Sequence, residues 1–238
     1  MRGTSPPSQE PSLSNERKFA GDARAFEAAA AVLDACCTPD RAHPAGRTNT
    51  VYYDTPDLRA WAEKEDGDGL KRKVRARWYG RPGELSGNVP VFLELKYRVG
   101  AARRKERAMS FAPASALEQA PLDDRFWLDL FARAAGRLGA PVGPAWAPTC
   151  MISYDRLRWD DPRGGSRVSL DRDIRAPRWN PARFPWGASV ELGEIVCEWK
   201  NRTGDPPAWA GEMVRAGLLL RSFSKYGECM ARLAGGRP

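Results

Sequence analysis

Three short segments of this 238-residue chain place a carboxylate and a lysine two residues apart. Side chains alternate between the two faces of a β-strand, so each such pair would lie on one surface if its segment is a strand. Cations interspersed with carboxylates suit the binding of an anionic phosphate chain, and the carboxylates suit a hard divalent cation. The three segments are Glu16-Arg17-Lys18, Glu94-Leu95-Lys96 and Glu198-Trp199-Lys200.

A fourth segment, residues 70–79, repeats the same alternation with a denser positive charge. Lys71, Lys73, Arg75 and Arg77 occupy every second position, while the residues between them include Val74, Ala76 and Trp78. For a single strand, the commoner meaning is a surface strand whose charges are solvated. Because several strands share this sense of alternation, a second possibility arises, a barrel with helices packed on its apolar outside and the charges lining its lumen.

The elements that would position these residues are eight candidate strands. Their alternating, short runs favour a sandwich or a barrel of mainly antiparallel strands, in the α+β class, over a parallel α/β sheet. Helices are expected at 22–33, within a helical insertion at 112–147, and at 224–233. The candidate strands are residues 15–20, 47–53, 70–79, 90–98, 103–111, 149–159, 166–174 and 191–200.

Composition restricts the function further. The net charge of +8 and pI near 9.5 favour an anionic partner. His43 is the only histidine and no Cys-x-x-Cys pair occurs, which disfavours phosphohistidine chemistry and a zinc site. The sequence has neither a membrane-length apolar run nor a signal-peptide core, so we expect a cytoplasmic protein. Residues 1–13 are expected to form a disordered tail ahead of a single domain at 14–235.

The order of several motifs resembles a known family. Glu16-Arg17-Lys18-Phe19, residues 51–57, residues 74–80 and residues 91–96 resemble the VTC domain, the catalytic domain of vacuolar transporter chaperone polyphosphate polymerases. That domain is a member of the triphosphate tunnel metalloenzyme (CYTH-like) superfamily. Further motifs follow in the family's order: Tyr154-Asp155-Arg156, residues 167–171, residues 196–200 and residues 222–225.

The resemblance implies an eight-stranded closed β-barrel with helices packed outside, whose tunnel binds a nucleoside triphosphate or polyphosphate together with Mn²⁺ or Mg²⁺. By position, it implies that Tyr154 and Ser224 hydrogen-bond the chain and that Glu198 holds the metal, with Glu94 and Asp171 as further candidates. Catalytic roles fall to Glu198, Lys200, Arg75 and Arg77. The implied phosphate ligands are Lys18, Arg75, Arg77, Lys96, Lys105, Arg156, Arg167, Lys200 and Lys225.

Two departures from the family pattern bear on function. Ser222 stands where the family tends to carry another basic residue, which bears on the preferred chain length. The eukaryotic polymerases also join this domain to a regulatory SPX domain and a membrane-spanning part. Neither is seen in this sequence, so we expect that this chain by itself does not couple synthesis to transport across a membrane.

Three functions are therefore considered. The first is a metal-dependent polyphosphate polymerase that transfers the γ-phosphate of a nucleotide to a growing chain. The second is hydrolysis of an inorganic or organic triphosphate. This reading is weakened because Ser14 stands two residues before Glu16, where tunnel hydrolases carry a further glutamate. The third is a non-catalytic binder of polyphosphate or nucleic acid. Nucleic acid is not the expected partner, because the cations are predicted to face a lumen.

Overall fold

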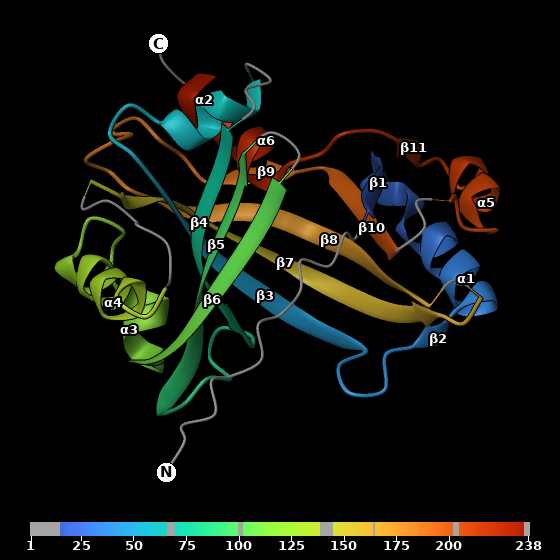
Figure 1. The fold of residues 1–238 in the computed structure, drawn as a ribbon, viewed down its shortest axis with the longest axis horizontal. Helices are drawn as coiled ribbons and strands as arrows, with labels where there is room; N and C mark the ends of the chain where they lie inside the picture. Colours follow the sequence, from blue (N-terminus) through green and yellow to red (C-terminus); the bar gives the residue numbers. More distant parts are fainter. Residues whose placement is uncertain are drawn as a thin grey trace.

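The computed structural model describes residues 15–65, 70–99, 102–138, 145–163, 165–201 and 205–235. The tail expected at residues 1–13 lies outside these ranges. The chain forms one curled sheet with helices at its periphery (Figure 1). No helix within the described ranges combines the length and the apolarity needed to cross a membrane.

Eight long strands form the sheet, and every pair of neighbours is antiparallel. Their order is β1-β10-β8-β7-β3-β4-β5-β6. This confirms the predicted mainly antiparallel fold and its eight strands. The bounds are β1 (Asn15–Asp22), β3 (Ala45–Asp54), β4 (Leu70–Tyr79), β5 (Asn88–Val99), β6 (Ala102–Pro113), β7 (Ala147–Asp161), β8 (Ser166–Trp179) and β10 (Glu194–Asn201).

The sheet curls around a lumen. Over the described residues, its hydrogen-bonded path ends at β6 on one side and at the short strand β11 (Leu219–Leu220), which pairs with β1, on the other. The curl brings Glu16 of β1 and Lys96 of β5 to the wall of one hollow. The predicted eight-stranded fold is therefore present as a curled sheet, and over the described residues no ladder of hydrogen bonds closes it between β1 and β6.

Two local irregularities were not predicted. The segment expected as one strand at 191–200 is divided at Gly193 into β9 (Val190–Leu192) and β10, and both strands pair with β8. In β8, Asp173 has a φ of 53°, and the register of β8 against β7 shifts near this point. Such bulges bend a strand and increase its twist, as a tightly curled sheet requires. The remaining short strand is β2 (Thr38–Pro39), paired with β7.

Helices α3 (Ala114–Gln119) and α4 (Arg125–Ala135) cover the outer face of β4, β5 and β6 (Figure 1). The Asp124 carboxylate begins α4 by accepting a 2.7 Å hydrogen bond from the amide of Phe126. The apolar positions of α4 recur with helical spacing, and they pack on the predicted outward-facing residues of β4. These positions of α4 are Trp127, Leu130, Phe131 and Ala134, and those of β4 are Val74, Ala76 and Trp78.

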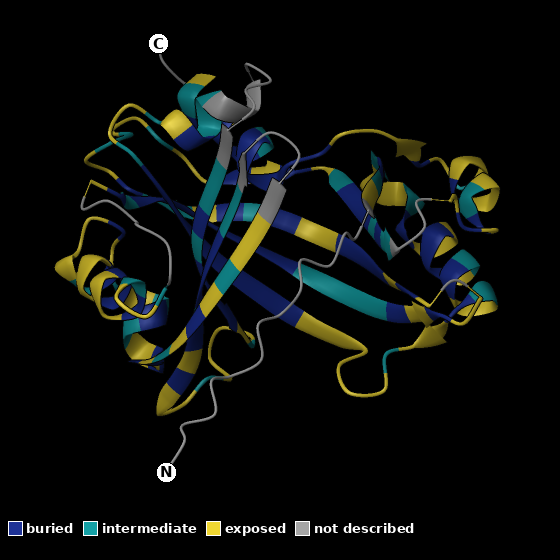
Figure 2. Cartoon of the chain, in the orientation of Figure 1, coloured by how far each residue is buried: buried dark blue, intermediate teal, exposed yellow. Residues whose placement is uncertain are grey.

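A second outer core lies under α1 (Phe26–Cys36) and α5 (Ala210–Arg215), where it covers β1, β8 and β10. The 3-10 turn η1 (Ala23–Ala25) precedes α1, and the carboxylate of Asp22 caps this turn as predicted. Exposed residues lie on the outward sides of these helices, while the strands beneath are largely buried (Figure 2). Both of these helical layers therefore lie outside the curled sheet.

Helix α6 (Lys225–Gly235) lies inside one end of the curl. Its buried residues Tyr226, Cys229 and Met230 pack against Tyr52 of β3, Ile152 of β7 and other inward-facing residues. The Tyr226 hydroxyl donates a 2.8 Å hydrogen bond to Asp54, whose carboxylate also accepts from the amides at the start of α2 (Arg59–Glu65). Asp54 thus fixes α2 and α6 to the end of β3.

Candidate functional site

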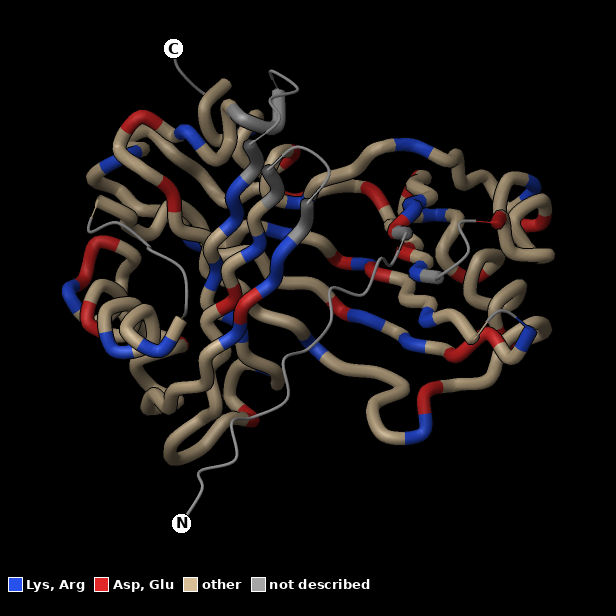
Figure 3. The backbone as a smooth tube through the Cα atoms, in the orientation of Figure 1, with Lys and Arg blue, Asp and Glu red and all other residues tan. Residues whose placement is uncertain are grey.

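A hollow of about 250 Å³ lies in the lumen, and its wall is dominated by cations. Eight Lys or Arg side chains line it against two carboxylates, a surplus that calls for an anionic ligand. Basic residues recur along β4, β5 and β6 and on the strands that curve past them (Figure 3). The lining residues are Glu16, Lys18, Tyr52, Lys73, Arg75, Arg77, Lys96, Tyr154, Arg156, Glu198, Lys200, Ser224 and Lys225.

The β4–β5 wall is organised around Arg75 and Glu94, which are paired across the two strands. Arg75 donates to Glu94 at 2.8 Å from Nε, and its Nη2 lies 2.6 Å from the same oxygen. Burial raises the pKa of Glu94, but Arg75, Arg77 and Lys105 outweigh burial and hold that pKa well below its usual range. Glu94 is therefore an ionised, buried anion that positions Arg75.

Among the described residues, no carboxylate is in direct contact with Arg77. Its Nε donates to Thr50 Oγ1 at 3.2 Å, and its Nη2 donates to the Tyr154 hydroxyl at 3.2 Å. Burial raises the pKa of Tyr154, yet the nearby Arg156 and Arg77 more than offset burial and lower that pKa. The positive charge of Arg77 is thus positioned by neutral groups and stays available to a phosphate.

Asp171 of β8 joins two other elements. Its two oxygens accept from Arg156 Nε at 2.6 Å and Arg156 Nη2 at 2.7 Å, and Lys225 Nζ of α6 lies 2.6 Å from Oδ2. Asp171 is fully buried. Burial raises its pKa, but Arg156 and Lys225 outweigh burial and lower it. Both oxygens are engaged by cations, so the geometry assigns Asp171 to orienting Arg156 and Lys225.

Glu198 of β10 lies among four cations at longer range. Its Oε1 is 3.5 Å from Lys18 and 3.6 Å from Lys225, and its Oε2 is 3.5 Å from Arg156 and 4.0 Å from Lys200. These distances exceed those of tight charge-assisted hydrogen bonds. Burial raises the pKa of Glu198, but the four cations prevail and lower it well below the usual range, so the carboxylate is ionised.

The β1–β10 wall completes the ring. Glu16 lies 3.3 Å from Lys18 and 3.6 Å from Lys200, so each E-x-K pair of the sequence interleaves with the other. This follows from the antiparallel register, in which Lys18 is opposite Glu198 and Glu16 opposite Lys200. The Lys18 ammonium also donates to the Phe223 carbonyl at 2.9 Å, which ties β1 to the segment before α6.

Lys96 is a cation of the ring whose charged form is disfavoured by its surroundings. Burial, followed by repulsion from Arg75, lowers the pKa of its ammonium to about 8. Lys73 lies in the same cross-strand row as Lys96, and its Nζ donates to Ser224 Oγ at 3.3 Å. The hydroxyl of Ser224 is therefore in reach of the lumen, on the turn that begins α6.

A divalent metal fits this site only together with phosphate. The described residues contain no group of three or more carboxylate, histidine or cysteine ligands suited to a metal. Mg²⁺ and Mn²⁺ commonly use one or two carboxylates plus phosphate oxygens. Glu198 meets that requirement because it is ionised and not tightly bonded, with Glu16 beside it. Glu94 and Asp171 are committed to close cations, so they fit the metal less well.

Four residues of the predicted set lie outside the lining of the hollow. Lys105 shares a row with Lys96 but its half-exposed ammonium pairs with Glu94 at 3.3 Å. Arg167 is exposed and is opposite Lys200 in the ladder, on the same face of the sheet. Glu94 and Asp171 are buried against the cations that they bind. The other predicted phosphate and metal residues line the hollow itself.

Tyr52 is a wall residue that the sequence did not predict. Its segment in β3 is buried throughout, so alternation gave no contrast by which to choose a face. Tyr52 stacks on Tyr226 with ring centroids 4.7 Å apart, at the point where α6 enters the lumen. The alternation of residues 70–79 predicts that Lys73 lies on the basic face, although the resemblance does not include Lys73 among the phosphate ligands.

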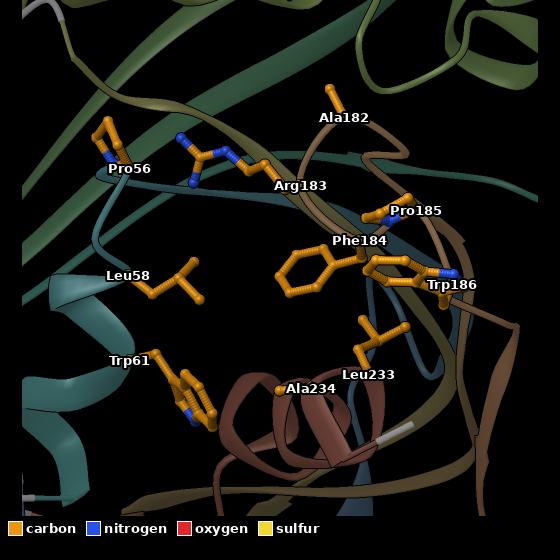
Figure 4. A pocket seen from close by; sticks show the side chains of 11 residues that line it. Pro56, Leu58, Trp61, Ala182, Arg183, Phe184, Pro185, Trp186, Leu233 and Ala234 are labelled. Carbon is orange, nitrogen blue, oxygen red and sulfur yellow. The ribbon is translucent and has the colours of Figure 1, made fainter. Parts of the chain in front are cut away.

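A larger hollow of about 640 Å³ has a different character. It lies between α2, the 182–187 segment and the end of α6, with Trp61, Phe184 and Trp186 around it (Figure 4). Arg183 is its one charged lining residue, and its guanidinium donates to the carbonyls of Thr55 and Asp54. The larger hollow therefore lacks the cluster of cations that lines the smaller one. The smaller, cationic hollow is the candidate active site.

Comparison with known proteins gives one family match. The sequence matches the family described as the VTC domain over residues 15–123 and 144–234. A search of the curated proteins gave no match.

Solved structures give more distant similarities. The chain is similar to a Hippeastrum protein assigned as an adenylyl cyclase and described as having a dominant triphosphatase activity (15% identity, TM-score 0.49, covering 92% of this chain and 96% of that one). It is also similar to a protein assigned as an adenylate cyclase from Bacillus halodurans (13% identity, TM-score 0.45, covering 79% and 80%). Such low identities and TM-scores carry no conclusion about activity.

Proposed function

The chain belongs to the VTC domain family, and on that premise we propose that it is a metal-dependent phosphotransferase that moves the γ-phosphate of a nucleoside triphosphate onto a polyphosphate chain. The observation that carries this proposal is the ring of eight cations around two carboxylates in the lumen. Phosphoryl transfer requires mainly positioning and charge stabilisation, because its loose transition state spreads negative charge over the phosphate oxygens.

The ring is suited to hold a phosphate chain in line. Arg75 and Arg156 are each oriented by a buried carboxylate, so their guanidinium groups need little reordering when phosphate arrives. Further positive charge in the same lining comes from Arg77, Lys96 and Lys200. Tyr154 and Ser224 supply hydroxyl donors on the same wall. With one histidine in the chain, a mechanism without a protein nucleophile also agrees with the composition.

Glu198, with Glu16 beside it, would hold Mn²⁺ or Mg²⁺ against the phosphate oxygens. Such an ion supplies Lewis-acid stabilisation and a template for the phosphates when bound. Four cations surround Glu198: Lys18, Lys200, Arg156 and Lys225. They would neutralise the phosphate oxygens that the metal does not contact. In this proposal the residues orient and neutralise the reacting chain, and the acceptor phosphate is the nucleophile.

The test is incubation of the purified chain with ATP and Mn²⁺, with polyphosphate resolved on a gel and ADP measured in parallel. We expect polymer whose phosphate content matches the ADP formed. Glu198→Gln is the matched variant, because it keeps the volume of the side chain and removes its charge. It should abolish the dependence of the rate on Mn²⁺. Bound ATP with neither polymer nor phosphate release in the wild type would contradict both enzymatic functions and indicate a binding protein.

A second candidate is hydrolysis of a triphosphate, with water as the acceptor. It is favoured by the packing of α6 into one end of the lumen, which suits a substrate of limited length. Glu16 and Glu198 would then share the metal, as two carboxylates often do in phosphate sites. Release of inorganic phosphate from tripolyphosphate, without chain growth in the same reaction, would decide for hydrolysis.

A further inference from the structure

The inward face of β4, β5 and β6 changes character along the strands. The ladders place Lys73, Lys96 and Lys105 in one cross-strand row, and Arg75, Glu94 and Arg107 in the next. The following row combines one cation, Arg77, with two apolar residues, Phe92 and Met109. Two residues farther along each strand come Tyr79, Pro90 and Phe111, of which Pro90 and Phe111 are paired. Successive rows are about 7 Å apart, since each residue rises ~3.3 Å.

This apolar end, here termed the aromatic row (Tyr79, Phe92, Met109 and Phe111), is open to solvent. Tyr79 is 41% exposed, Met109 48% and Phe111 55%. Single exposed apolar residues are common, but a group of them on one surface commonly marks a binding site. The rings of Tyr79 and Phe92 are tilted by 56° with centroids 6.3 Å apart, so the two rings contact each other without stacking face to face.

The aromatic row is continuous with the cationic hollow. The Arg107 guanidinium lies 3.7 Å from the centroid of the Phe92 ring, and its Nε is 3.8 Å from Glu94. Glu94 in turn holds Arg75, which lines the hollow, and Phe92 is opposite Arg77, another lining residue. The residues of the aromatic row lie one or two cross-strand rows beyond Arg75. A ligand with its phosphates on Arg75 and Arg77 would therefore reach them.

We infer that the aromatic row binds the base of a nucleoside triphosphate whose phosphates lie in the cationic hollow. This inference rests on the proposed function, which names the donor as a nucleoside triphosphate, and it adds the site that binds the base of that donor. An inorganic chain has no apolar surface and gives no use for exposed rings on the inward face. A base has a π-face that stacks on aromatic rings and on a guanidinium plane such as that of Arg107.

Stacking of this kind has a predictable selectivity. It depends on the faces of the base rather than on hydrogen bonds to its edges, so ATP and GTP should bind with similar affinity. Replacing a stacking ring by alanine should weaken nucleotide binding about tenfold, within a range of about 5- to 100-fold. Binding of inorganic tripolyphosphate should be unaffected, because it carries no base.

The test is calorimetric titration of ATP and of tripolyphosphate, at matched salt and Mn²⁺, into wild type, Tyr79→Ala and Phe111→Ala. Leu128→Ala is the matched control, since Leu128 is a similarly exposed apolar residue, 43%, on the outer helix α4. Thermal melts of all four proteins check folding. We expect the two ring variants to lose ATP affinity about tenfold and keep tripolyphosphate affinity within twofold, while the control changes neither.

Equal changes in the two affinities, or no change in either, would overturn the base site. If the wild type binds tripolyphosphate and the ring variants keep full ATP affinity, only this inference fails. If the wild type binds neither ligand, the proposed function fails with it. A wild-type dimer in light scattering that the ring variants abolish, with ATP affinity unchanged, would assign the aromatic row to a second copy and also overturn the base site.

Discussion

At the scale of single residues, the two arginines of β4 differ in what holds them. Arg75 neutralises Glu94, which is 3% exposed, whereas Arg77 contacts the hydroxyls of Thr50 and Tyr154. Removing one partner of a buried ion pair is more harmful than removing a cation from a cationic surplus, because the remaining charge stays buried. The two arginines therefore allow a test that separates folding from ligand binding.

We predict that Arg77→Ala keeps the free energy of unfolding of the ligand-free protein within about 0.5 kcal/mol of wild type, since it relieves repulsion as it removes contacts. Arg75→Ala should lower it by about 1–3 kcal/mol, with Lys105 and Arg107 limiting the loss at Glu94. Urea denaturation of both variants measures this. Both should lose most of the thermal shift caused by tripolyphosphate. Equal stability of the two variants would contradict the structural role of Glu94.

Lys96 gives a prediction on pH. The pKa of its ammonium is lowered to about 8, against about 10.4 in an unfolded chain. Below pH 8 the charged form therefore costs stability, and that cost is relieved as pH rises from 8 toward 10. Bound phosphate favours the charged form, so ligand affinity should be full below pH 8 and should fall above it.

The matched variant is Lys96→Met, which keeps the length of the side chain without its charge. The ligand-free variant should be more stable than wild type by about 1–2 kcal/mol at pH 7, and this difference should vanish toward pH 10. Its affinity for tripolyphosphate, measured by titration from pH 7 to 9.5, should lose the part of the pH dependence that Lys96 causes. The ligand's own titration cancels in the comparison. A parallel pH profile in both proteins would refute the assignment.

At the scale of elements, Asp171 joins β8, β7 and α6 through Arg156 and Lys225. We predict that Asp171→Asn lowers the free energy of unfolding by about 3 kcal/mol, because it leaves two buried cations with only Glu198 nearby. The loss should be full from neutral pH down to about pH 4, and it should shrink only as pH falls further toward the lowered pKa of Asp171. Denaturation at pH 7 and about pH 2 checks this. A loss that is independent of pH would indicate packing instead of charge.

The elements also show how far the sequence could predict the site. Period-two alternation placed Lys18, Arg77 and Glu198 on one face correctly, because each strand has an apolar opposite face covered by helices. It could not place Tyr52, whose strand is buried on both faces. The entry of α6 into the lumen was also not predicted, since helical periodicity identifies an apolar face but not the surface that it covers.

At the scale of the whole molecule, the cationic surplus predicts the response to anions. Tripolyphosphate at a hundredfold excess over its Kd should stabilise the protein by about 2.7 kcal/mol, or about 5–10 °C in Tm. The shift should shrink as salt rises, because exposed members of the ring are screened. Differential scanning fluorimetry measures it, with sulfate at equal ionic strength as the control. An equal shift from sulfate would indicate general ion effects.

Hydrogen bonds also join residues near the start of the described chain to residues near its end. Lys18 donates to the carbonyl of Phe223, 205 positions later, and β1 pairs with β10 and β11. A ribosome adds about 5–20 residues per second, so β1 waits about 10–40 s for its partners. During that time its apolar Phe19 and its backbone edge are unprotected. Biosynthesis of this protein should therefore depend on chaperones that shield nascent strands, more than its final stability would suggest.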